Sequence, residues 1–286
     1  MLRPVRILIV DDRFDHQPNR GSESIKDQLL AKYNDPSMVL IEFAAGLTIA
    51  KEMIKENFFH LVLADHELRP GFGAEILRDV RDMRPSCRRV LITEHPEVAN
   101  AGAAILFGAL LPPMPLAHAF VTRNLRSYEE TIDACIEVIG FDEVEMFECT
   151  GGPPVLEAIR DHRSRIVSAI QQRLPQGQVR FTVHELAHIV SRLFQSAFFQ
   201  MGERFSARSG DNDSIGSVEL QALTGGRSSS VVVRCVPITR DQRHRGSTCV
   251  LKIGPRNEIN EEMMRYDRFV RFYRSTARRV EVLGAV

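Results

Sequence analysis

Short apolar runs alternate with helical periods along the first half of the chain. The runs are rich in Val, Ile and Leu and lack polar alternation, which predicts strands buried on both faces of a sheet. They lie at residues 5–10, 37–43, 60–64, 88–93 and 118–122. Apolar side chains at helical spacing lie between them, at residues 24–33, 46–57 and 74–83. Alternating strands and helices predict an α/β fold with a doubly wound, five-stranded parallel sheet.

The first domain is expected to end near residue 140. A helix predicted over residues 127–139 opens with a capping box and meets Gly140 at its end. Residues 147–154 then hold two glycines and two prolines, a pattern that favours a domain boundary. We therefore assign residues 1–140 to the first domain.

Two further regions are expected after this boundary. Amphipathic helices predicted over residues 155–173 and 182–200 indicate a helical connector at residues 153–205. Their apolar stripes could also serve as a dimerisation element, which would make the protein a homodimer. Strand patterns then return, so residues 215–286 are expected to form a small α+β module.

Composition excludes several classes of protein. Lys plus Arg equal Asp plus Glu at 37 each, so no overall charge favours nucleic acid or an anionic membrane. No apolar run reaches the roughly 20 residues that span a bilayer. The cysteines are odd in number and form no Cys-x-x-Cys pair, which favours reduced thiols and a cytoplasmic location. They are Cys87, Cys135, Cys149, Cys235 and Cys249.

Acidic side chains directly follow two of the predicted strands. Asp11 and Asp12 come after the first strand, and Asp65 comes after the third. Because ligands of parallel sheets bind at the carboxyl ends of the strands, we expect these carboxylates to meet there. Mg²⁺ is the natural cation for such oxygen ligands, and a carboxylate held beside it can attack a phosphoryl group. Thr93 ends the fourth strand and could donate its hydroxyl to a phosphoryl oxygen.

These residues, in this order, resemble the receiver domain of two-component response regulators over about 135 residues. The resemblance rests on the segments ILIVDD, LVLADHELRPGFG and VLIT. It implies a flavodoxin-like receiver fold in which Asp65 accepts a phosphoryl group from a histidine kinase or another phosphodonor. Asp11 and Asp12 would hold Mg²⁺ together with Asp65, and Thr93 would respond to phosphorylation. The implied function is phosphorelay signalling, with the C-terminal module receiving the signal.

The sequence departs from the receiver family at the end of the fifth strand. The family has a lysine there that contacts the phosphoryl group, whereas this chain has Arg123. Arginine keeps the positive charge, but its planar fork is not equivalent to an ammonium group. A degenerate receiver that acts as a scaffold for docking partners is therefore an alternative function.

The C-terminal module is similar to the small lobe of protein-kinase-like and antibiotic-phosphotransferase-like folds. A glycine-rich turn between two strands is followed by a strand that carries a lysine and by an acidic helix, an order that implies nucleotide or phosphate binding. The positions concerned are Gly225, Gly226, Ser228, Lys252 and Glu262. The lysine and the glutamate are closer in sequence than in ordinary kinases. No large lobe with catalytic aspartates follows in the sequence, so we expect no kinase activity beyond phosphorylation and dephosphorylation of the receiver.

The second helix of the predicted connector contains a metalloprotease-like pattern. His184, Glu185 and His188 form a His-Glu-x-x-His arrangement, which could bind Zn²⁺ through two imidazoles with Glu185 as general base. A catalytic zinc needs a third protein ligand, and the sequence supplies none at a familiar spacing. A zinc hydrolase is therefore the less favoured alternative, and both histidines are expected on the polar side of the helix.

Overall fold

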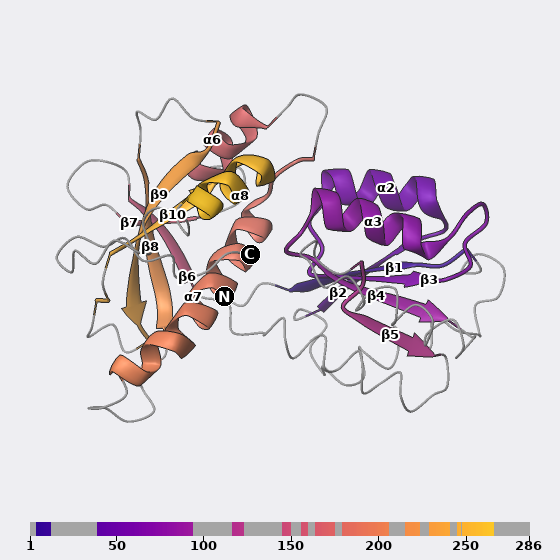
Figure 1. The fold of residues 1–286 in the computed structure, drawn as a ribbon, viewed down its shortest axis with the longest axis horizontal. Coiled ribbons are helices and arrows are strands. Elements are labelled where there is room, and N and C mark those ends of the chain that lie inside the picture. Colours follow the sequence, from indigo (N-terminus) through magenta and orange to yellow (C-terminus); the bar gives the residue numbers. More distant parts are fainter. Residues whose placement is uncertain are drawn as a thin grey trace. The chain divides into compact units, whose positions relative to one another are not determined.

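The chain divides into two compact units, Met1–Glu143 and Val144–Val286, and each contains its own β-sheet (Figure 1). The computed structural model describes residues 4–12, 39–93, 116–122, 145–149, 156–159, 164–174, 179–205, 215–223, 229–240, 245–246 and 248–265. No described helix combines the length and the apolar composition that crossing a membrane requires.

The N-terminal unit is built on a parallel sheet with the strand order β2-β1-β3-β4-β5. Its strands are β1 (Val5–Val10), β2 (Val39–Ala44), β3 (Leu61–Asp65), β4 (Arg88–Thr93) and β5 (Ala119–Thr122). Helices α2 (Leu47–Glu56) and α3 (Gly73–Met83) lie together on one face of this sheet (Figure 1). The predicted fold class is confirmed. The helices predicted over residues 24–33 and 127–139 lie outside the described residues.

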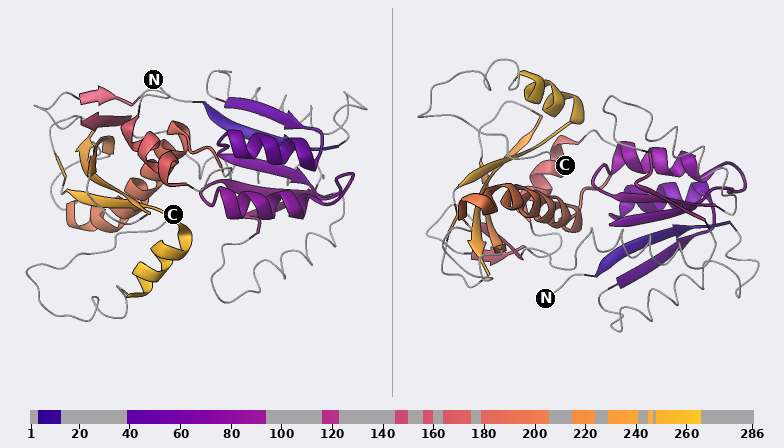
Figure 2. Two further views of the ribbon diagram at one scale, coloured as in Figure 1. Left: turned by 90° about the horizontal axis from the view of Figure 1, so that it is seen from above. Right: turned by 60° about the horizontal axis from the view of Figure 1, so that its bottom comes forward.

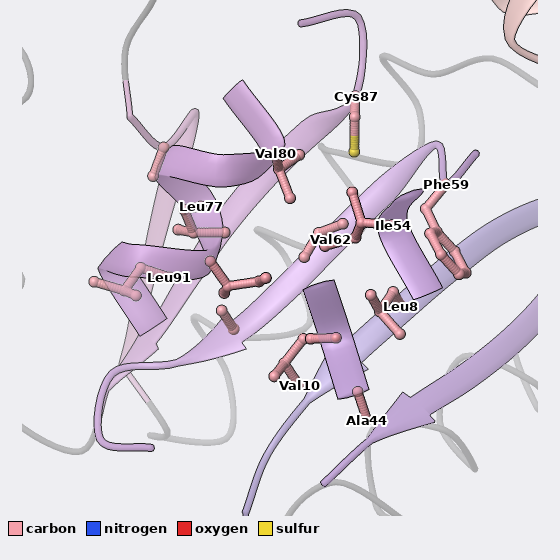
Figure 3. Close-up of a cluster of buried hydrophobic side chains, with 14 of the residues drawn as sticks. Leu8, Val10, Ala44, Ile54, Phe59, Val62, Leu77, Val80, Cys87 and Leu91 are labelled. Carbon is pink, nitrogen blue, oxygen red and sulfur yellow. The ribbon is translucent and has the colours of Figure 1, made fainter. Parts of the chain in front are cut away.

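Both faces of this sheet are buried, as its unbroken apolar strands predict. In β1, Ile7 and Ile9 belong to one core cluster, whereas Leu8 and Val10 belong to the cluster beneath α2 and α3. Figure 3 shows the second cluster, where side chains of the strands meet those of the two helices. Each fully buried Leu, Ile or Phe contributes about 1.5–3 kcal/mol relative to an exposed one, so this core holds the carboxyl ends of the strands in place.

Two buried arginines bind the loops at the opposite end of the sheet. Arg84 donates hydrogen bonds to the carbonyl oxygens of Ile54 and Lys55 in the last turn of α2, at 3.2 and 3.1 Å. Arg89 donates to the carbonyl oxygen of Leu116, just before β5, at 3.0 Å. Burial lowers the pKa of Arg89 to about 10. These contacts satisfy carbonyl groups that helix and strand ends would otherwise leave unpaired.

The C-terminal unit contains a mixed sheet with the order β10-β9-β8-β6-β7. The strands are β6 (Glu145–Cys149), β7 (Leu156–Ala158), β8 (Ile215–Leu223), β9 (Val231–Thr239) and β10 (Cys249–Ile253). β6 pairs parallel with β8, and the other neighbours pair antiparallel. The helices are α6 (Arg165–Arg173), α7 (Val183–Phe205) and α8 (Arg256–Arg265).

The helix predicted over residues 155–173 is wrong in its first part. Leu156–Ala158 is a strand that pairs with β6, and the helix begins only at Arg165. Ser164 caps that helix by accepting a hydrogen bond from the backbone N–H of Val167. β6 itself lies where a boundary is expected, because its alternating polar side chains stand next to a glycine- and proline-rich segment in the sequence.

Helices α6 and α7 pack against the second sheet. Ile166 and Leu186 share one core cluster with Val218 of β8 and Val233 of β9, and both helices lie beside that sheet in Figures 1 and 2. The structure therefore places the residues of the expected connector within the second unit. Their predicted role in dimerisation stays a prediction.

Candidate functional site

Three aspartates meet at the carboxyl ends of β1 and β3. Asp11 and Asp12 follow β1, and Asp65 is the last residue of β3. A ligand oxygen from each of the three side chains lies within 4.8 Å of the others. In this strand order, β2 and β3 lie on opposite sides of β1. The carboxyl ends of β1 and β3 therefore mark the topological switch point, where doubly wound sheets bind ligands.

The electrostatics of this trio favour a bound cation. Asp11 and Asp65 are each only 4% exposed. At separations of 4.8 Å or less, two unit charges repel by at least about 3.5 kcal/mol at an effective dielectric constant of about 20. Oδ2 of Asp12 accepts a hydrogen bond from the backbone N–H of Arg69 at 3.1 Å, whereas its Oδ1 is buried without a hydrogen-bond partner. Oxygen ligands with one unsatisfied acceptor fit a hard divalent cation such as Mg²⁺.

The loop after Asp65 is held close to the site. The backbone N–H of Gly73, the first residue of α3, donates to the carbonyl oxygen of His66 at 3.0 Å. A Cβ at Gly73 would overlap the carbonyl oxygen of Asp65, so only glycine allows α3 to begin this close. Sequence reasoning missed this positioning role and the contact of Asp12 with Arg69. Gly73, eight residues after Asp65, was the sequence signal that could have indicated this close approach.

Thr93 lies on the strand next to the acceptor. It is the last residue of β4 and is 1% exposed. Asp65 pairs with Ile92 in the sheet register, so Thr93 follows the position opposite the acceptor. Sequence reasoning therefore places Asp11, Asp12 and Asp65 correctly in one cluster and Thr93 on the adjacent strand. Arg123 lies outside the described residues.

The second candidate site is only partly described. Lys252 of β10 forms an ion pair with Glu262 of α8, and their side chains are 27% and 50% exposed. The hydroxyl of Ser229 donates to Glu258, which also ties α8 to the start of the β9 segment. The turn residues Gly225, Gly226 and Ser228 lie outside the described residues.

The His-Glu-x-x-His pattern lies on α7, and two of its residues are buried. Glu185 and His188 are 4% and 3% exposed, and His184 is partly exposed. The expectation that both histidines lie on an exposed polar side is therefore wrong for His188. Within the part of the chain that the structure describes, the aspartate trio is the only group of three side chains placed to hold a metal ion. The pattern on α7 has no third ligand there.

The strand order and the acidic switch point define the N-terminal unit as a flavodoxin-like doubly wound domain. No protein-family model matches the chain, and no curated protein matches it significantly. Its N-terminal half is similar to solved response-regulator receiver domains.

Three of these structures come from different organisms. A CheY-like receiver domain protein from Methanospirillum hungatei is 22% identical, with a TM-score of 0.34, and the match covers 47% of this chain and 95% of the other. The receiver domain of an HD domain-containing protein from Pseudomonas fluorescens is 22% identical, with a TM-score of 0.35 and coverage of 48% and 96%. A response regulator from Thermotoga maritima, in complex with Mg²⁺ and BeF, is 18% identical, with a TM-score of 0.31 and coverage of 46% and 97%.

Proposed function

We propose that this chain is a phosphorelay signalling protein that accepts a phosphoryl group on Asp65 from a histidine kinase or another phosphodonor. The carrying observation is the trio of carboxylates at the switch point, two of which are almost fully buried. Such a cluster suits Mg²⁺ and phosphoryl chemistry, and the receiver-like sequence assigns the acceptor role to Asp65. The second unit would receive the signal as an interaction module. A cytoplasmic location follows from this role.

The residues of the site would divide the chemistry among them. A carboxylate oxygen of Asp65 attacks the phosphorus of a phosphohistidine, and the bond from phosphorus to the donor nitrogen breaks with its electron pair passing to the imidazole. Asp11 and Asp12 would hold Mg²⁺ together with Asp65, and the bound ion would neutralise charge on the phosphoryl oxygens. The Thr93 hydroxyl would donate a hydrogen bond to one of these oxygens, and Arg123 would supply positive charge in place of the family's lysine.

The decisive test is the intact mass of the full chain after incubation with acetyl phosphate and Mg²⁺. We expect one added phosphoryl group on the wild type and none on Asp65→Asn. Asp82→Asn is the matched control, because Asp82 is an exposed aspartate of α3 outside the cluster, and it should be phosphorylated normally. If the wild type stays unmodified with acetyl phosphate and with purified histidine kinases, the relay is refuted. The scaffold alternative would then be favoured, with partner binding insensitive to Asp65→Asn.

Binding of Mg²⁺ can be tested without phosphorylation. Added Mg²⁺ should raise the Tm of the wild type, because an ion that binds only the folded state stabilises it by mass action. The rise should be lost in Asp12→Asn, which removes one charge but keeps an oxygen acceptor for the N–H of Arg69. An equal rise in both proteins would show that Asp12 is not a ligand.

A second candidate function is nucleotide or phosphate binding by the C-terminal unit. The ion pair of Lys252 with Glu262 favours this function. Exposed ion pairs contribute only about 0–1 kcal/mol to stability, so folding alone gives little reason for this pair. Calorimetric titration with Mg-ATP should show binding that weakens at least tenfold in Lys252→Ala. Arg265→Ala, at an exposed arginine of the same helix, serves as the control. If the wild type binds no Mg-ATP, this candidate is wrong.

A further inference from the structure

Two cysteines lie directly opposite each other in the second sheet. Cys235 of β9 pairs with Cys249 of β10 in an antiparallel register. Because directly opposed residues of antiparallel strands point to the same face, both thiols face the core beneath α6 and α7. Cys235 is a fully buried member of that core cluster, and Cys249 is partly buried against it.

This register satisfies the main geometric demand of a disulfide. Opposed residues in antiparallel strands have Cα atoms roughly 4.5–5.5 Å apart, and disulfides connect Cα atoms roughly 4.4–6.8 Å apart. Among the described strands, β10 lies at the edge of the sheet with β9 as its neighbour, so it can adjust by the small amount that a sulfur–sulfur bond requires. The other described cysteines differ: Cys87 lies in the N-terminal unit, and Cys149 of β6 donates its thiol hydrogen to Glu219.

We propose that Cys235 and Cys249 form a redox pair that a small-molecule disulfide such as oxidised glutathione converts into a cross-strand disulfide. The less buried Cys249 thiolate attacks one sulfur of glutathione disulfide, whose sulfur–sulfur bond breaks and releases one glutathione thiolate. The Cys235 thiolate then attacks the Cys249 sulfur and displaces the second glutathione. Two protein thiols are oxidised, one glutathione disulfide is reduced, and the two protons pass to the released glutathione thiolates.

The surroundings of the pair make this reaction dependent on pH. Burial, and to a smaller extent the neighbouring Cys249, raises the pKa of the Cys235 thiol to about 12. Burial also raises the pKa of Cys249. Since only thiolates attack, both steps are slow at neutral pH and accelerate as the pH rises. The pair therefore resists brief oxidation and responds to sustained oxidising conditions.

The disulfide would act on the edge of the sheet. β10 also carries Lys252, three residues after Cys249, and through it the ion pair with Glu262 of α8. A covalent bond from β10 to the neighbouring strand β9 would hold this edge and slow the opening of its hydrogen bonds. Oxidation would thus reduce amide hydrogen exchange in β10 relative to the reduced protein.

Peptide mapping of the full chain tests the proposal. After incubation with oxidised glutathione at pH 8.5 and 9.5, acid quenching, alkylation and digestion, we expect a linked peptide that joins Cys235 to Cys249, formed faster at the higher pH. Cys149→Ser should still form this link, and Cys249→Ser should not. Because the wild type alone gives the answer, a folding defect in a variant does not affect the test.

Two outcomes would overturn the proposal. Both thiols could stay fully alkylatable in the folded wild type at pH 9.5, while the chain unfolded in urea is oxidised readily. The two cysteines would then only fill the core. Alternatively, a glutathione adduct could persist on Cys249 without transfer to Cys235, which would show that the two sulfurs do not reach each other.

Discussion

Gly73 begins α3 against the backbone of the acceptor residue, and alanine there is expected to displace Asp65. A Cβ at this position would lie 2.9 Å from the carbonyl carbon of Asp65 and 3.1 Å from Cδ1 of Leu91, and it would overlap the Asp65 carbonyl oxygen. Ordinary contact begins near 3.4 Å, so the carbon must move by at least half an ångström. The hydrogen bond from the Gly73 N–H to His66 would lengthen with it.

The cost of Gly73→Ala follows from these contacts. Overpacking a tight site costs about 1–3 kcal/mol, and a weakened backbone hydrogen bond adds about 1 kcal/mol. The sum of about 2–4 kcal/mol should accelerate amide exchange in β3 and α3 by about 30-fold to 1000-fold, since 1.4 kcal/mol is a factor of ten. Phosphorylation by acetyl phosphate should also slow strongly, because misplacement of a reacting group by about 1 Å costs up to about 100-fold.

Hydrogen exchange followed by mass spectrometry measures the first effect, and the rate of mass gain with acetyl phosphate measures the second. Gly71→Ala is the control in the same loop. A Cβ there meets only the ends of the Leu47 and Glu75 side chains, and the φ of 106° at this position is strained for alanine. It should destabilise the loop while leaving Asp65 in place. If Gly73→Ala exchanges and phosphorylates like the wild type, the close approach of α3 to the acceptor is refuted.

Three further predictions concern groups away from the acceptor. His60→Phe should lower the stability measured by thermal unfolding by about 1–3 kcal/mol. Nδ1 of His60 accepts a hydrogen bond from the backbone N–H of Arg6 at 3.0 Å, and phenylalanine would leave that donor unsatisfied. An unchanged Tm would contradict this prediction. Glu148→Ala should destabilise the second unit by about 1–2 kcal/mol in urea unfolding followed by circular dichroism, because Glu148 accepts two backbone N–H groups in the first turn of α6. Cys149 should react with iodoacetamide along a pH profile whose midpoint lies near 11, because burial and then the hydrogen bond to Glu219 raise its pKa. Glu219→Gln should move that midpoint to lower pH, and an unmoved midpoint would show that the carboxylate has no influence.

The N-terminal fold and its site could be predicted from the sequence because their signals are local. Strands buried on both faces appear as continuous apolar runs, and β1 and β4 match the predicted ranges at residues 5–10 and 88–93. Asp11 and Asp65 stand directly at the ends of such runs, so the topology of a parallel sheet alone brings them together. The role of Gly73 could not be predicted, because it depends on the distance between a helix and the preceding strand.

The second unit was harder to predict because its sheet joins distant segments. β6 pairs with β8, about 70 residues further along the chain, and neither segment's pattern contains information about that partner. Without this pairing, Glu145–Cys149 looks like part of a linker, and α6 and α7 look like helices without a sheet to cover. The cysteine pair has the same origin, since only the register of β9 against β10 places Cys235 opposite Cys249.

Buried carboxylates of two kinds occur in the described structure, and the contrast between them marks the site. Glu148 is buried, but it accepts the backbone N–H groups of Arg165 and Ile166 at 3.1 and 3.2 Å, so the positive end of α6 offsets its charge. Asp65 is equally buried and lies within 4.8 Å of two further carboxylates. The first arrangement stabilises the fold through hydrogen bonds, whereas close carboxylates repel one another, and a bound cation would offset that repulsion. Arrangements of the second kind concentrate at functional sites, so the switch point is the place to look for chemistry even without the receiver resemblance.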